Sequence, residues 1–269
     1  MKKQGLATGD GGKISAFIIA KNEADRIPRA VRSVRDWVDE VVVIDSGSTD
    51  ETVKVCEALG ARVVFNVWQG YGPQKVFGET LCRNDWILNI DADEEVSPSL
   101  RREIEEIVGS TASAMVTGYR LPVLPLYPFQ ASGHRWTISN YPIRLYRRSS
   151  AGFRDSPVHD SVIVREGSIG TLKNVLIHRS FRSLGHHLEK INSYTSAQAE
   201  DAFSAGRYPS TLKLLFTPIF AFFRSFILRR EFVNGIDGVV ISYMYAIQRF
   251  MKVAKIREIM RIKSIGRNV

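Results

Sequence analysis

The stretch EVVVIDSGSTDE, residues 40–51, joins a β-branched apolar run to a series of turn and capping residues. The apolar run is typical of a buried strand, and Gly47 permits a tight turn directly after Asp45. Ser48 and Glu51 stand three residues apart, which predicts a capping box at the start of a helix. The stretch therefore predicts a strand that passes through a short turn into a helix, whose end is marked by Gly60.

The same alternation of strand and helix continues on both sides of this stretch. Apolar runs of strand length alternate with segments whose apolar residues recur at helical spacing. Such alternation predicts an α/β fold of Rossmann-like type, with a mostly parallel sheet and helices on both faces. The predicted strands are Ile14–Ala20, Glu40–Asp45, Ala61–Val67 and Trp86–Ile90, and the predicted helices cover 27–38, 48–60 and Gln74–Arg83 and begin again at Ser97-Pro98.

The pattern changes after Gly118, where short apolar runs alternate with Pro, Gly, Ser and His residues as far as Ser180. This part predicts an antiparallel or mixed extension of the sheet, and helical periodicity returns from Leu184 to the end of the chain. We therefore expect a flexible tail over 1–12, an α/β domain over 13–205 and a basic amphipathic helical extension over 206–269. The strand candidates in the extension of the sheet are Ile143–Arg147, Ser161–Arg165 and Leu172–His178.

Polar and acidic side chains stand where the predicted strands end. Asn22 and Glu23 follow the first strand, Asp45 ends the second, and Asp91 and Asp93 follow the fourth. The carboxyl ends of parallel strands lie at one edge of a sheet, and ligands of such folds bind beyond that edge. We therefore expect these side chains to surround a ligand site.

Asp91 and Asp93 form a D-x-D pattern directly after the apolar run WILNI, residues 86–90. Two carboxylates at a strand end can share a divalent cation, and Mg²⁺ or Mn²⁺ prefers such oxygen ligands. The pattern also arises by chance, and together with Glu94 and Glu95 these acids could only cap the next helix. Their position at the end of the fourth strand favours the metal site.

The composition limits the classes of partner. There are 37 Lys and Arg residues against 28 Asp and Glu, a net charge of +9, which favours nucleic acid, an anionic membrane face or a phosphorylated substrate. Cys56 and Cys82 are isolated, so we expect small core residues of a reduced cytosolic protein. Lys2 and Lys3 have no apolar run behind them, so no signal peptide is predicted and a cytoplasmic protein is expected.

The C-terminal segment combines apolar and basic residues. Residues 212–228 are strongly apolar, but two basic residues and Pro218 interrupt the run of about 20 apolar residues that spanning a membrane requires. Residues 249–267 hold seven basic residues and one acid, Glu258, which leaves +6. Such helices suit binding in the plane of an anionic membrane surface. A helical subdomain packed on the α/β domain, or a dimer interface, would explain the same pattern.

Three runs resemble the nucleotide-binding half of family 2 glycosyltransferases, over roughly residues 14–106. They are IIAKNE (18–23), VIDSGSTDET (43–52) and WILNIDADEE (86–95). Four further runs are similar to bacterial lipopolysaccharide core glycosyltransferases, notably the β-1,4-glucosyltransferases that act on the inner-core heptose. These are WQGYGPQK (68–75), IRLYRR (143–148), SPVHDSV (156–162) and HRSFRSL (178–184).

The resemblance implies a GT-A type fold and an inverting, metal-dependent transfer of a sugar, glucose by this likeness, from a UDP-sugar. The implied acceptor is a lipid-linked oligosaccharide such as the lipopolysaccharide inner core, with another polyprenyl-linked or cell-surface glycan as the alternative. The implied place is the cytoplasmic face of the inner membrane, where the C-terminal helices would bind peripherally. No nucleic-acid partner is expected, and the oligomeric state is left open.

The resemblance also implies roles for single residues. Asp45 would bind the base, which agrees with its place at a strand end, while Asp91 and Asp93 would hold the cation. One departure is Ser46, where many members of the family have Asp or Asn. The implied nucleotide-sugar site consists of Ala20, Asn22, Glu23, Asp45, Lys75, Asp91 and Ala92.

Inverting transfer requires a base that takes the proton of the acceptor hydroxyl. The resemblance points to Asp160 as this catalytic base, with Asp155 as the second candidate. His159 could orient that acid and His178 could complete the metal shell, although a lone histidine is more often structural.

Two other functional classes compete with the transferase. A nucleotidyltransferase would favour an early glycine-rich loop ending in Arg and Lys, and residues 20–23 (AKNE) do not supply one. A basic module that docks on RNA or a membrane without chemistry explains the charge but not the acids at the strand ends. The transferase is therefore the leading interpretation.

Overall fold

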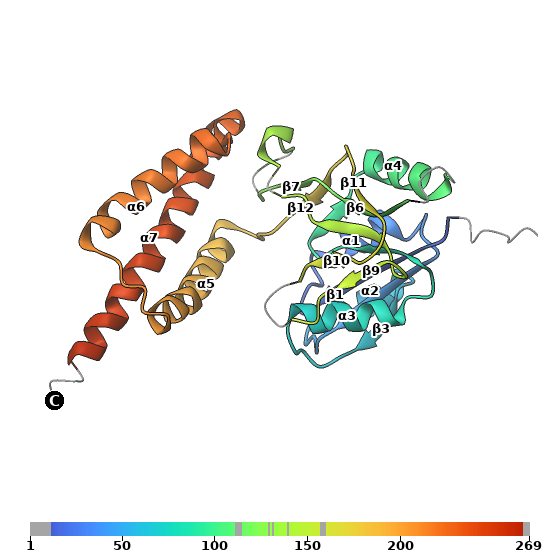
Figure 1. Ribbon diagram of the computed structural model, residues 1–269, viewed down its shortest axis with the longest axis horizontal. Coiled ribbons are helices and arrows are strands. Elements are labelled where there is room, and N and C mark those ends of the chain that lie inside the picture. Colours follow the sequence, from blue (N-terminus) through green and yellow to red (C-terminus); the bar gives the residue numbers. More distant parts are fainter. Residues whose placement is uncertain are drawn as a thin grey trace, which may run out of the picture. The chain divides into compact units, whose positions relative to one another are not determined.

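The computed structural model describes residues 12–110, 115–128, 130, 132–138, 140–156 and 160–265. The chain divides into two compact units. One unit consists of Met1–Leu124 with Ser139–His178 and contains the sheets, and the other consists of Pro125–Ile138 with Arg179–Val269 and is helical (Figure 1).

A seven-stranded sheet forms the centre of the first unit, in the order β11-β6-β8-β4-β1-β2-β3. Strands β1 to β4 run parallel to one another, and β8 is antiparallel to both of its neighbours. The prediction of a mostly parallel sheet with a mixed extension is confirmed. The strands are β1 (Ile14–Ala20), β2 (Glu40–Asp45), β3 (Arg62–Phe65), β4 (Trp86–Asn89), β6 (Val116–Arg120), β8 (Ile143–Arg147) and β11 (Ser168–Thr171).

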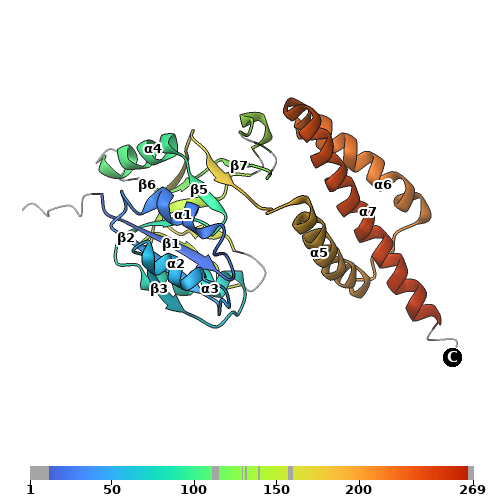
Figure 2. The ribbon, with the colours of Figure 1, turned by 180° about the vertical axis from the view of Figure 1, so that it is seen from behind.

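Helices cover both faces of this sheet (Figure 2), as the alternation predicts. Ala16 and Ile18 of β1 join the core formed with α1 (Ile27–Val34), α2 (Thr52–Ala58) and α4 (Pro98–Gly109). Phe17 and Ile19 point to the opposite face, where α3 (Tyr71–Leu81) and the hairpin of β9 (Ala151–Phe153) and β10 (Val162–Val164) pack. All residues of β1 are buried because successive side chains of a strand alternate between two covered faces.

A three-stranded sheet in the order β5-β12-β7 lies in the same unit. Its strands are β5 (Glu94–Val96), β12 (Leu176–His178) and β7 (Val123–Pro125), and β5 is antiparallel to β12. The acids after β4 therefore form a turn and the start of β5. The cap of α4 is Ser97, whose hydroxyl oxygen accepts a hydrogen bond from the Leu100 N–H at 3.2 Å. The alternative that the four acids only cap the next helix is thus not supported.

Two local predictions are wrong. Helix α2 begins at Thr52, and Glu51 makes no capping hydrogen bond, so the capping box does not form. Asp50 precedes the N-cap residue Glu51, and its carboxylate accepts a hydrogen bond from the Thr52 N–H at 3.0 Å. Helix α3 begins at Tyr71, three residues before the predicted Gln74.

Two other local predictions are confirmed. Gly60 follows α2 with a left-handed φ of 82°, as a glycine after a helix end should. Cys56 and Cys82 are buried free thiols, as expected of small core residues.

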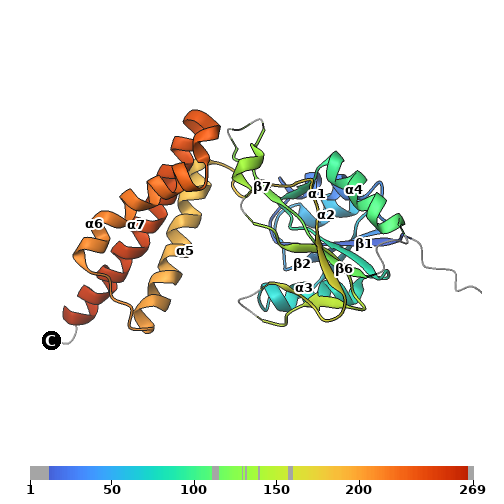
Figure 3. The same ribbon diagram turned by 45° about the horizontal axis from the view of Figure 1, so that its top comes forward.

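The helical unit is built around α7 (Gly235–Ile265), against which α5 (Leu184–Ser204) and α6 (Thr211–Phe223) pack (Figure 3). A π-helical turn, η3 (Arg224–Leu228), continues α6, and a 3-10 turn, η4 (Glu231–Asn234), precedes α7; the 3-10 turn η2 (Arg135–Thr137) also belongs to this unit. Ala199 and Ala202 of α5 form a small core with Ile256 of α7. This packing groups α5 with the later helices, although the predicted domain boundary lies after α5, at residue 205.

The segment Thr211–Leu228 is long and apolar enough to cross a membrane by length and composition, with a mean hydropathy of 1.5. Only 11% of this segment is buried in the structure. An apolar helix in the core of a water-soluble domain would be largely buried. The exposure of this segment therefore requires a separate explanation.

Candidate active site

Three neighbouring strands of the central sheet bring the predicted site residues to one edge. Strand β1 lies between β4 and β2, and all three run parallel, so their carboxyl ends are adjacent. The residues after β1, the end of β2 and the turn after β4 therefore lie at this edge, as the sequence predicts. What each side chain contacts there decides what it can do.

The loop after β1 is bonded to the turn after β2. Asn22 has a left-handed φ of 54°, its N–H donates to the Ser48 hydroxyl oxygen at 2.9 Å, and its side-chain oxygen accepts from the Thr49 N–H at 2.8 Å. Ala20 pairs with Asp45 across β1 and β2, and the Ala20 carbonyl accepts from the Ser46 N–H. These bonds hold the two loops as one ordered wall of the site.

Asp45 holds the turn that follows β2. Its carboxylate accepts hydrogen bonds from the Gly47 N–H at 2.9 Å, the Ser48 N–H at 3.0 Å and the Ser48 hydroxyl. Its side chain is buried. A carboxylate has about four acceptor positions, so roughly one remains for a ligand. These hydrogen bonds stabilise the turn, which is a structural role. Hydrogen bonding to a nucleotide base would be an additional role.

Lys75 projects from α3 into the site and is fully buried. Its ammonium nitrogen lies 3.0 Å from Asp91 Oδ1 and 2.8 Å from Asp160 Oδ2. The structure thus brings together three predicted site residues that are 85 positions apart at most. A buried lysine is rarely tolerated without such partners.

Asp91 also pairs with Arg144 of β8, a residue that the sequence analysis did not single out. Arg144 Nη2 lies 2.6 Å from Asp91 Oδ2 and 2.8 Å from Glu94 Oε1, while Nη1 donates to the Asn89 side-chain oxygen at 2.7 Å. Because β8 is antiparallel to β4, with Leu88 opposite Leu145, the start of β8 meets the end of β4. The antiparallel register therefore delivers this cation to the site.

Asp93 faces different cations. Its carboxylate lies 3.2 Å from Arg26 Nη1 and 3.4 Å from His178 Nε2. Arg26 also forms a two-point ion pair with Glu23, so Glu23 is tied to Asp93 through the guanidinium. His178 reaches this place because β12 pairs with β5, with His178 opposite Glu94.

The charges of the site shift several pKa values. Burial disfavours the anion of Asp91, but Arg144 and Lys75 outweigh it and lower the pKa of Asp91 below its ordinary value. Burial acts in the same way on Asp93, and the hydrogen bond and charge of His178, with Arg26, lower its pKa. Burial lowers the pKa of His178, yet Asp93 raises it overall. Both aspartates are therefore carboxylates at neutral pH.

Asp160 contacts the cluster through Lys75 and is about half exposed, at 46% of its side chain. Asp155, the second candidate for the base, is exposed and forms no ion pair with the part of the cluster that the structure describes. His159 lies outside the described residues. The segment 154–156 crosses the start of α3, where a Cβ on Gly72 would lie 2.2 Å from the Ser156 carbonyl oxygen.

The residues at Asp93 fit a divalent cation in part. Asp93 Oδ1 and His178 Nε2 are 3.4 Å apart, and neighbouring ligands of an octahedral ion at roughly 2.1 Å stand about 3 Å apart. Within the described ranges, no group of three or more His, Cys, Asp and Glu residues could hold a metal. The donor set therefore suits an ion such as Mg²⁺ or Mn²⁺ that takes most of its ligands from phosphate and water.

Three charged residues of the site were missed by the sequence analysis: Arg26, Glu94 and Arg144. The available signal was an arginine between two apolar residues of a predicted strand, Ile143 and Leu145. A guanidinium buried in a sheet requires an acid beside it. Which acid it meets depends on strand pairing, which local sequence does not state. Ala92, predicted at the donor site, is buried between Asp91 and Asp93.

The comparisons with known proteins point to one family. The model of glycosyl transferase family 2 matches residues 15–154. An uncharacterized glycosyltransferase of Rickettsia bellii is 43% identical over 92% of this chain and 87% of its own length. The lipopolysaccharide core biosynthesis glycosyltransferase LpsC of Rhizobium meliloti is 30% identical over 90% of this chain and 91% of its own length.

Solved structures align over smaller shares of the chain. Glucosyl-3-phosphoglycerate synthase from Mycobacterium tuberculosis, in complex with Mn²⁺, UDP-glucose and phosphoglyceric acid, is 26% identical over 44% of this chain and 45% of that chain. The TM-score of this alignment is 0.35.

Proposed function

The chain belongs to glycosyl transferase family 2, and from this premise we propose that it moves a sugar from a UDP-sugar to a lipid-linked acceptor, with inversion and a divalent cation. Membership makes the chain a glycosyltransferase, and the mostly parallel sheet with a C-terminal helical region agrees with the GT-A type fold expected. The observation that best supports the proposal is the cluster of Lys75, Asp91 and Asp93 at the carboxyl edge of the sheet.

The proposed donor site follows from the charges at this edge. A bound diphosphate would contact side-chain cations that now pair with Asp91 and Asp93. One of these cations is Lys75, which is buried with its ammonium group between Asp91 and Asp160. A bound cation would supply positive charge to balance the diphosphate. Ala20, Asn22, Glu23 and Asp45 would border the base and ribose, because their loops form the adjoining wall. Ala92 would lie at the same donor site, between the two aspartates.

The proposed cation site consists of Asp91 and Asp93, with His178 as a further ligand. The separation of 3.4 Å between Asp93 Oδ1 and His178 Nε2 supports this set. Arg26 would then lose its contact with Asp93 and keep its two-point pair with Glu23. Titration of UDP in the presence of Mg²⁺ and, separately, of Mn²⁺ would identify the preferred ion.

We assign the role of base to Asp160. Its half-exposed carboxylate lies 2.8 Å from Lys75, so it is held beside the proposed donor site while remaining open to an acceptor. A base must come within hydrogen-bond reach of the acceptor hydroxyl in the bound complex. Asp155 has no comparable tie to the part of the cluster that the structure describes, which favours Asp160.

The proposed acceptor rests on the similarity to LpsC, whose name refers to the lipopolysaccharide core. A lipid-linked oligosaccharide such as the inner core is the leading acceptor and glucose the leading sugar. Another polyprenyl-linked or cell-surface glycan is the alternative. A screen of UDP-sugars against truncated lipopolysaccharides and polyprenyl-linked acceptors separates the two.

The helical unit would bind the enzyme peripherally to the cytoplasmic face of the inner membrane. The segment Thr211–Leu228 is apolar and exposed, which supports contact with lipid. It packs against α7, which carries Arg249 and Lys252 in the same hairpin, and burying such charges at the bilayer centre is costly. An orientation in the plane of the membrane surface avoids that cost.

The first test is calorimetric titration of UDP into the protein, with Mn²⁺ and then with EDTA. We expect binding that requires the metal. Asp93→Ala should abolish this metal-dependent binding and turnover while leaving the circular dichroism spectrum unchanged, because the carboxylate lies at a loop outside the core. Metal-dependent binding by the variant would refute the cation site, and absence of binding by the parent protein would refute the UDP donor.

A further inference from the structure

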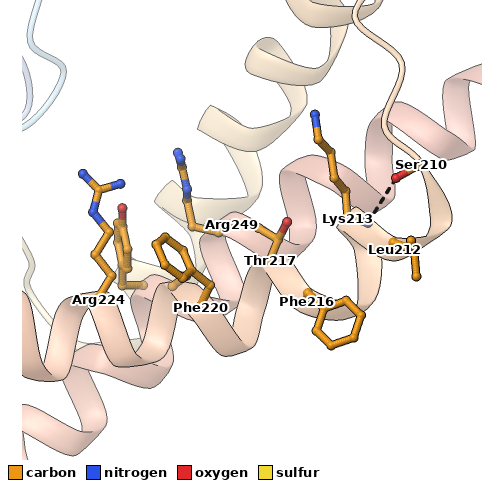
Figure 4. A pocket seen from close by; sticks show the side chains of 10 residues that line it. Ser210, Leu212, Lys213, Phe216, Thr217, Phe220, Arg224 and Arg249 are labelled. Carbon is orange, nitrogen blue, oxygen red and sulfur yellow. Dashed lines mark hydrogen bonds between the residues drawn. The ribbon is translucent and has the colours of Figure 1, made fainter.

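A groove of about 540 Å³ lies between α6 and α7 (Figure 4). Three of its lining residues are basic, Lys213, Arg224 and Arg249, and none of the lining residues is acidic. The remainder of the lining is mostly apolar or aromatic. The full lining is Ser210, Leu212, Lys213, Phe216, Thr217, Phe220, Ala221, Arg224, Tyr245 and Arg249.

Helical spacing explains why the basic residues share this groove. Lys213, Thr217, Phe220 and Arg224 follow one another at intervals of four, three and four residues, which places them on one face of the helix. Arg249 joins them from α7, and Figure 4 shows the three basic side chains pointing to the same side. Lys213 and Arg224 are eleven residues apart, which is roughly 16 Å along a helix. The groove thus presents a row of cations.

This row of cations lacks an acidic lining residue in the part of the chain that the structure describes. Among the described residues, no ion pair involves Lys213, Arg224 or Arg249, and all three residues are exposed. The pKa of Lys252, three residues after Arg249, is lowered by burial first and then by the like charges of Arg249 and Arg207, which outweigh the opposing effect of Asp201. The groove is therefore a positive surface that no ion pair among the described residues neutralises.

Large apolar side chains stand beside these cations. Leu212, Phe216 and Phe220 are 65%, 60% and 66% exposed. An exposed apolar patch of this kind marks an interaction surface in a soluble protein. A second copy of the chain is a poor occupant, because docking groove to groove would bring two rows of cations together. An amphiphile with an anionic head meets both the charge and the apolar surface.

We propose that the α6–α7 groove binds anionic phospholipids of a membrane surface. The lipid phosphates would lie against Lys213, Arg224 and Arg249, and the acyl chains would lie against Phe216 and Phe220. This assignment rests on the proposed membrane association and deepens it, because it names the lipid class and the residues that recognise it. It is independent of the UDP-sugar site, which lies wholly in the other unit.

The test is co-sedimentation of the full chain with vesicles of phosphatidylcholine alone and of phosphatidylcholine with phosphatidylglycerol. We expect binding only with phosphatidylglycerol. Arg249→Gln should weaken it about fivefold and Arg249→Glu about 25-fold, since each cation at an anionic surface contributes on the order of a factor of five. Arg224→Glu should act similarly. Arg32→Glu, at an exposed position of α1 in the other unit, makes the same change in net charge and should bind as the parent does.

A second pair of variants tests the apolar part. Phe216→Ser and Phe220→Ser change exposed side chains and should leave the fold intact, while lowering vesicle binding at every salt concentration. The charge variants should instead reduce the dependence of binding on salt. The circular dichroism spectrum of each variant shows whether its helices are retained. Titration of UDP with Mn²⁺ into each variant tests the donor site separately, because that site lies in the other unit.

The outcomes separate the ideas. If the parent protein binds neither kind of vesicle, both membrane association and the groove are refuted. If the parent binds but the groove variants behave as Arg32→Glu does, the groove is refuted and membrane association stands. Inorganic phosphate is then added at the same concentration as the lipid phosphate. If it releases the protein from the vesicles, the ligand of the groove is free phosphate and the lipid proposal is overturned. If single-stranded RNA at an equal concentration of charge displaces the protein from the vesicles, the lipid proposal is overturned in favour of nucleic acid.

Discussion

Asp91 and Asp93 are separated by one residue, yet their carboxylates contact different cations. Asp91 lies between Lys75 and Arg144, whereas Asp93 lies between Arg26 and His178. Each carboxylate thus remains ionised in a partly buried setting, because paired charge offsets the loss of water. A bound diphosphate or cation would therefore replace existing ion pairs. It would not have to enter an uncharged cavity.

Asp160→Asn tests the proposed base. The variant should keep metal-dependent UDP binding but lose transfer by about 10²-fold or more, because general base catalysis contributes on the order of 10² to 10⁴ in rate. Single-turnover transfer assays together with UDP titration measure the two effects separately. Asp155→Asn is the matched control and should retain activity. If Asp160→Asn is active and Asp155→Asn is not, the roles of the two residues are exchanged.

Glu79 gives a prediction about stability and pH. Its buried carboxyl group accepts hydrogen bonds from the Tyr146 hydroxyl and the Phe153 N–H, and burial raises its pKa above 4.5 in spite of these bonds. A carboxyl group whose pKa is raised in the folded state binds more protons there than in the unfolded state. Its contribution to stability is therefore full below a pH of about 4.5 and is lost as pH rises through the raised folded pKa.

Glu79→Gln should remove this dependence, since an amide oxygen can accept the same two bonds without titrating. Urea denaturation from pH 4 to pH 8 would show the parent losing stability relative to the variant as pH rises. Parallel stability curves for the two proteins would contradict the assigned shift. UDP titration provides the control that the variant still folds around its donor site.

At the scale of elements, strand β8 decides the composition of the site. It is the one antiparallel neighbour of β4, and this direction brings Arg144 at its start to Asp91 at the end of β4. A parallel strand in that position would place its first residues at the opposite edge of the sheet. Helix α3 acts in a similar way, because Lys75 reaches the site only when the helix lies close to the sheet.

Gly72→Ala tests the close approach at the start of α3. An added Cβ would lie 2.2 Å from the Ser156 carbonyl oxygen and 2.7 Å from that of Arg154, so the segment leading to Asp160 must move. We expect a loss of about 1–3 kcal/mol in unfolding free energy, typical of overpacking, and a reduction of transfer that exceeds the loss of UDP binding.

Gly109→Ala is the matched control, because nothing lies within 4 Å of the Cβ that it would add. Its unfolding free energy should stay within about 0.5 kcal/mol of the parent value. Equal effects of the two substitutions would show that the contact of Gly72 with residues 154–156 has no special consequence. Thermal unfolding and transfer assays on both variants provide the comparison.

At the scale of the whole molecule, two units carry two proposed tasks. All residues of the proposed donor site and the base lie in the unit of sheets, whereas the row of cations and the exposed apolar side chains lie in the helical unit. The sheet unit has its own buried core on both faces of the central sheet. Such a core is a condition for folding without the helices.

A chain that ends at Ser183 should therefore fold and bind UDP with Mn²⁺ at unchanged affinity, but should no longer bind anionic vesicles. Calorimetry and vesicle co-sedimentation measure the two properties on one preparation. The control is the full chain carrying Arg249→Glu, which keeps the helices and lowers vesicle binding alone. Loss of UDP binding in the shortened chain would show that the helical unit supports the donor site.

The amino-acid sequence alone determined the order of strands and helices over the first half of the chain, and the place of the acids in it. Apolar periodicity is a local property, so β1, β2, β4 and the helices between them could be predicted within a few residues. The placement of Asp45, Asp91 and Asp93 at one edge then followed from the rule for parallel sheets. The family resemblance came from the same short runs.

Tertiary structure decided which charges meet. Arg144 lies 53 positions from Asp91, and Lys75 lies 85 positions from Asp160, so strand direction and helix packing bring them together. The packing of α5 with α7 was likewise set by contacts beyond the local pattern. The physical reason is that periodicity reports which face of an element is apolar, whereas an ion pair depends on the relative placement of two elements.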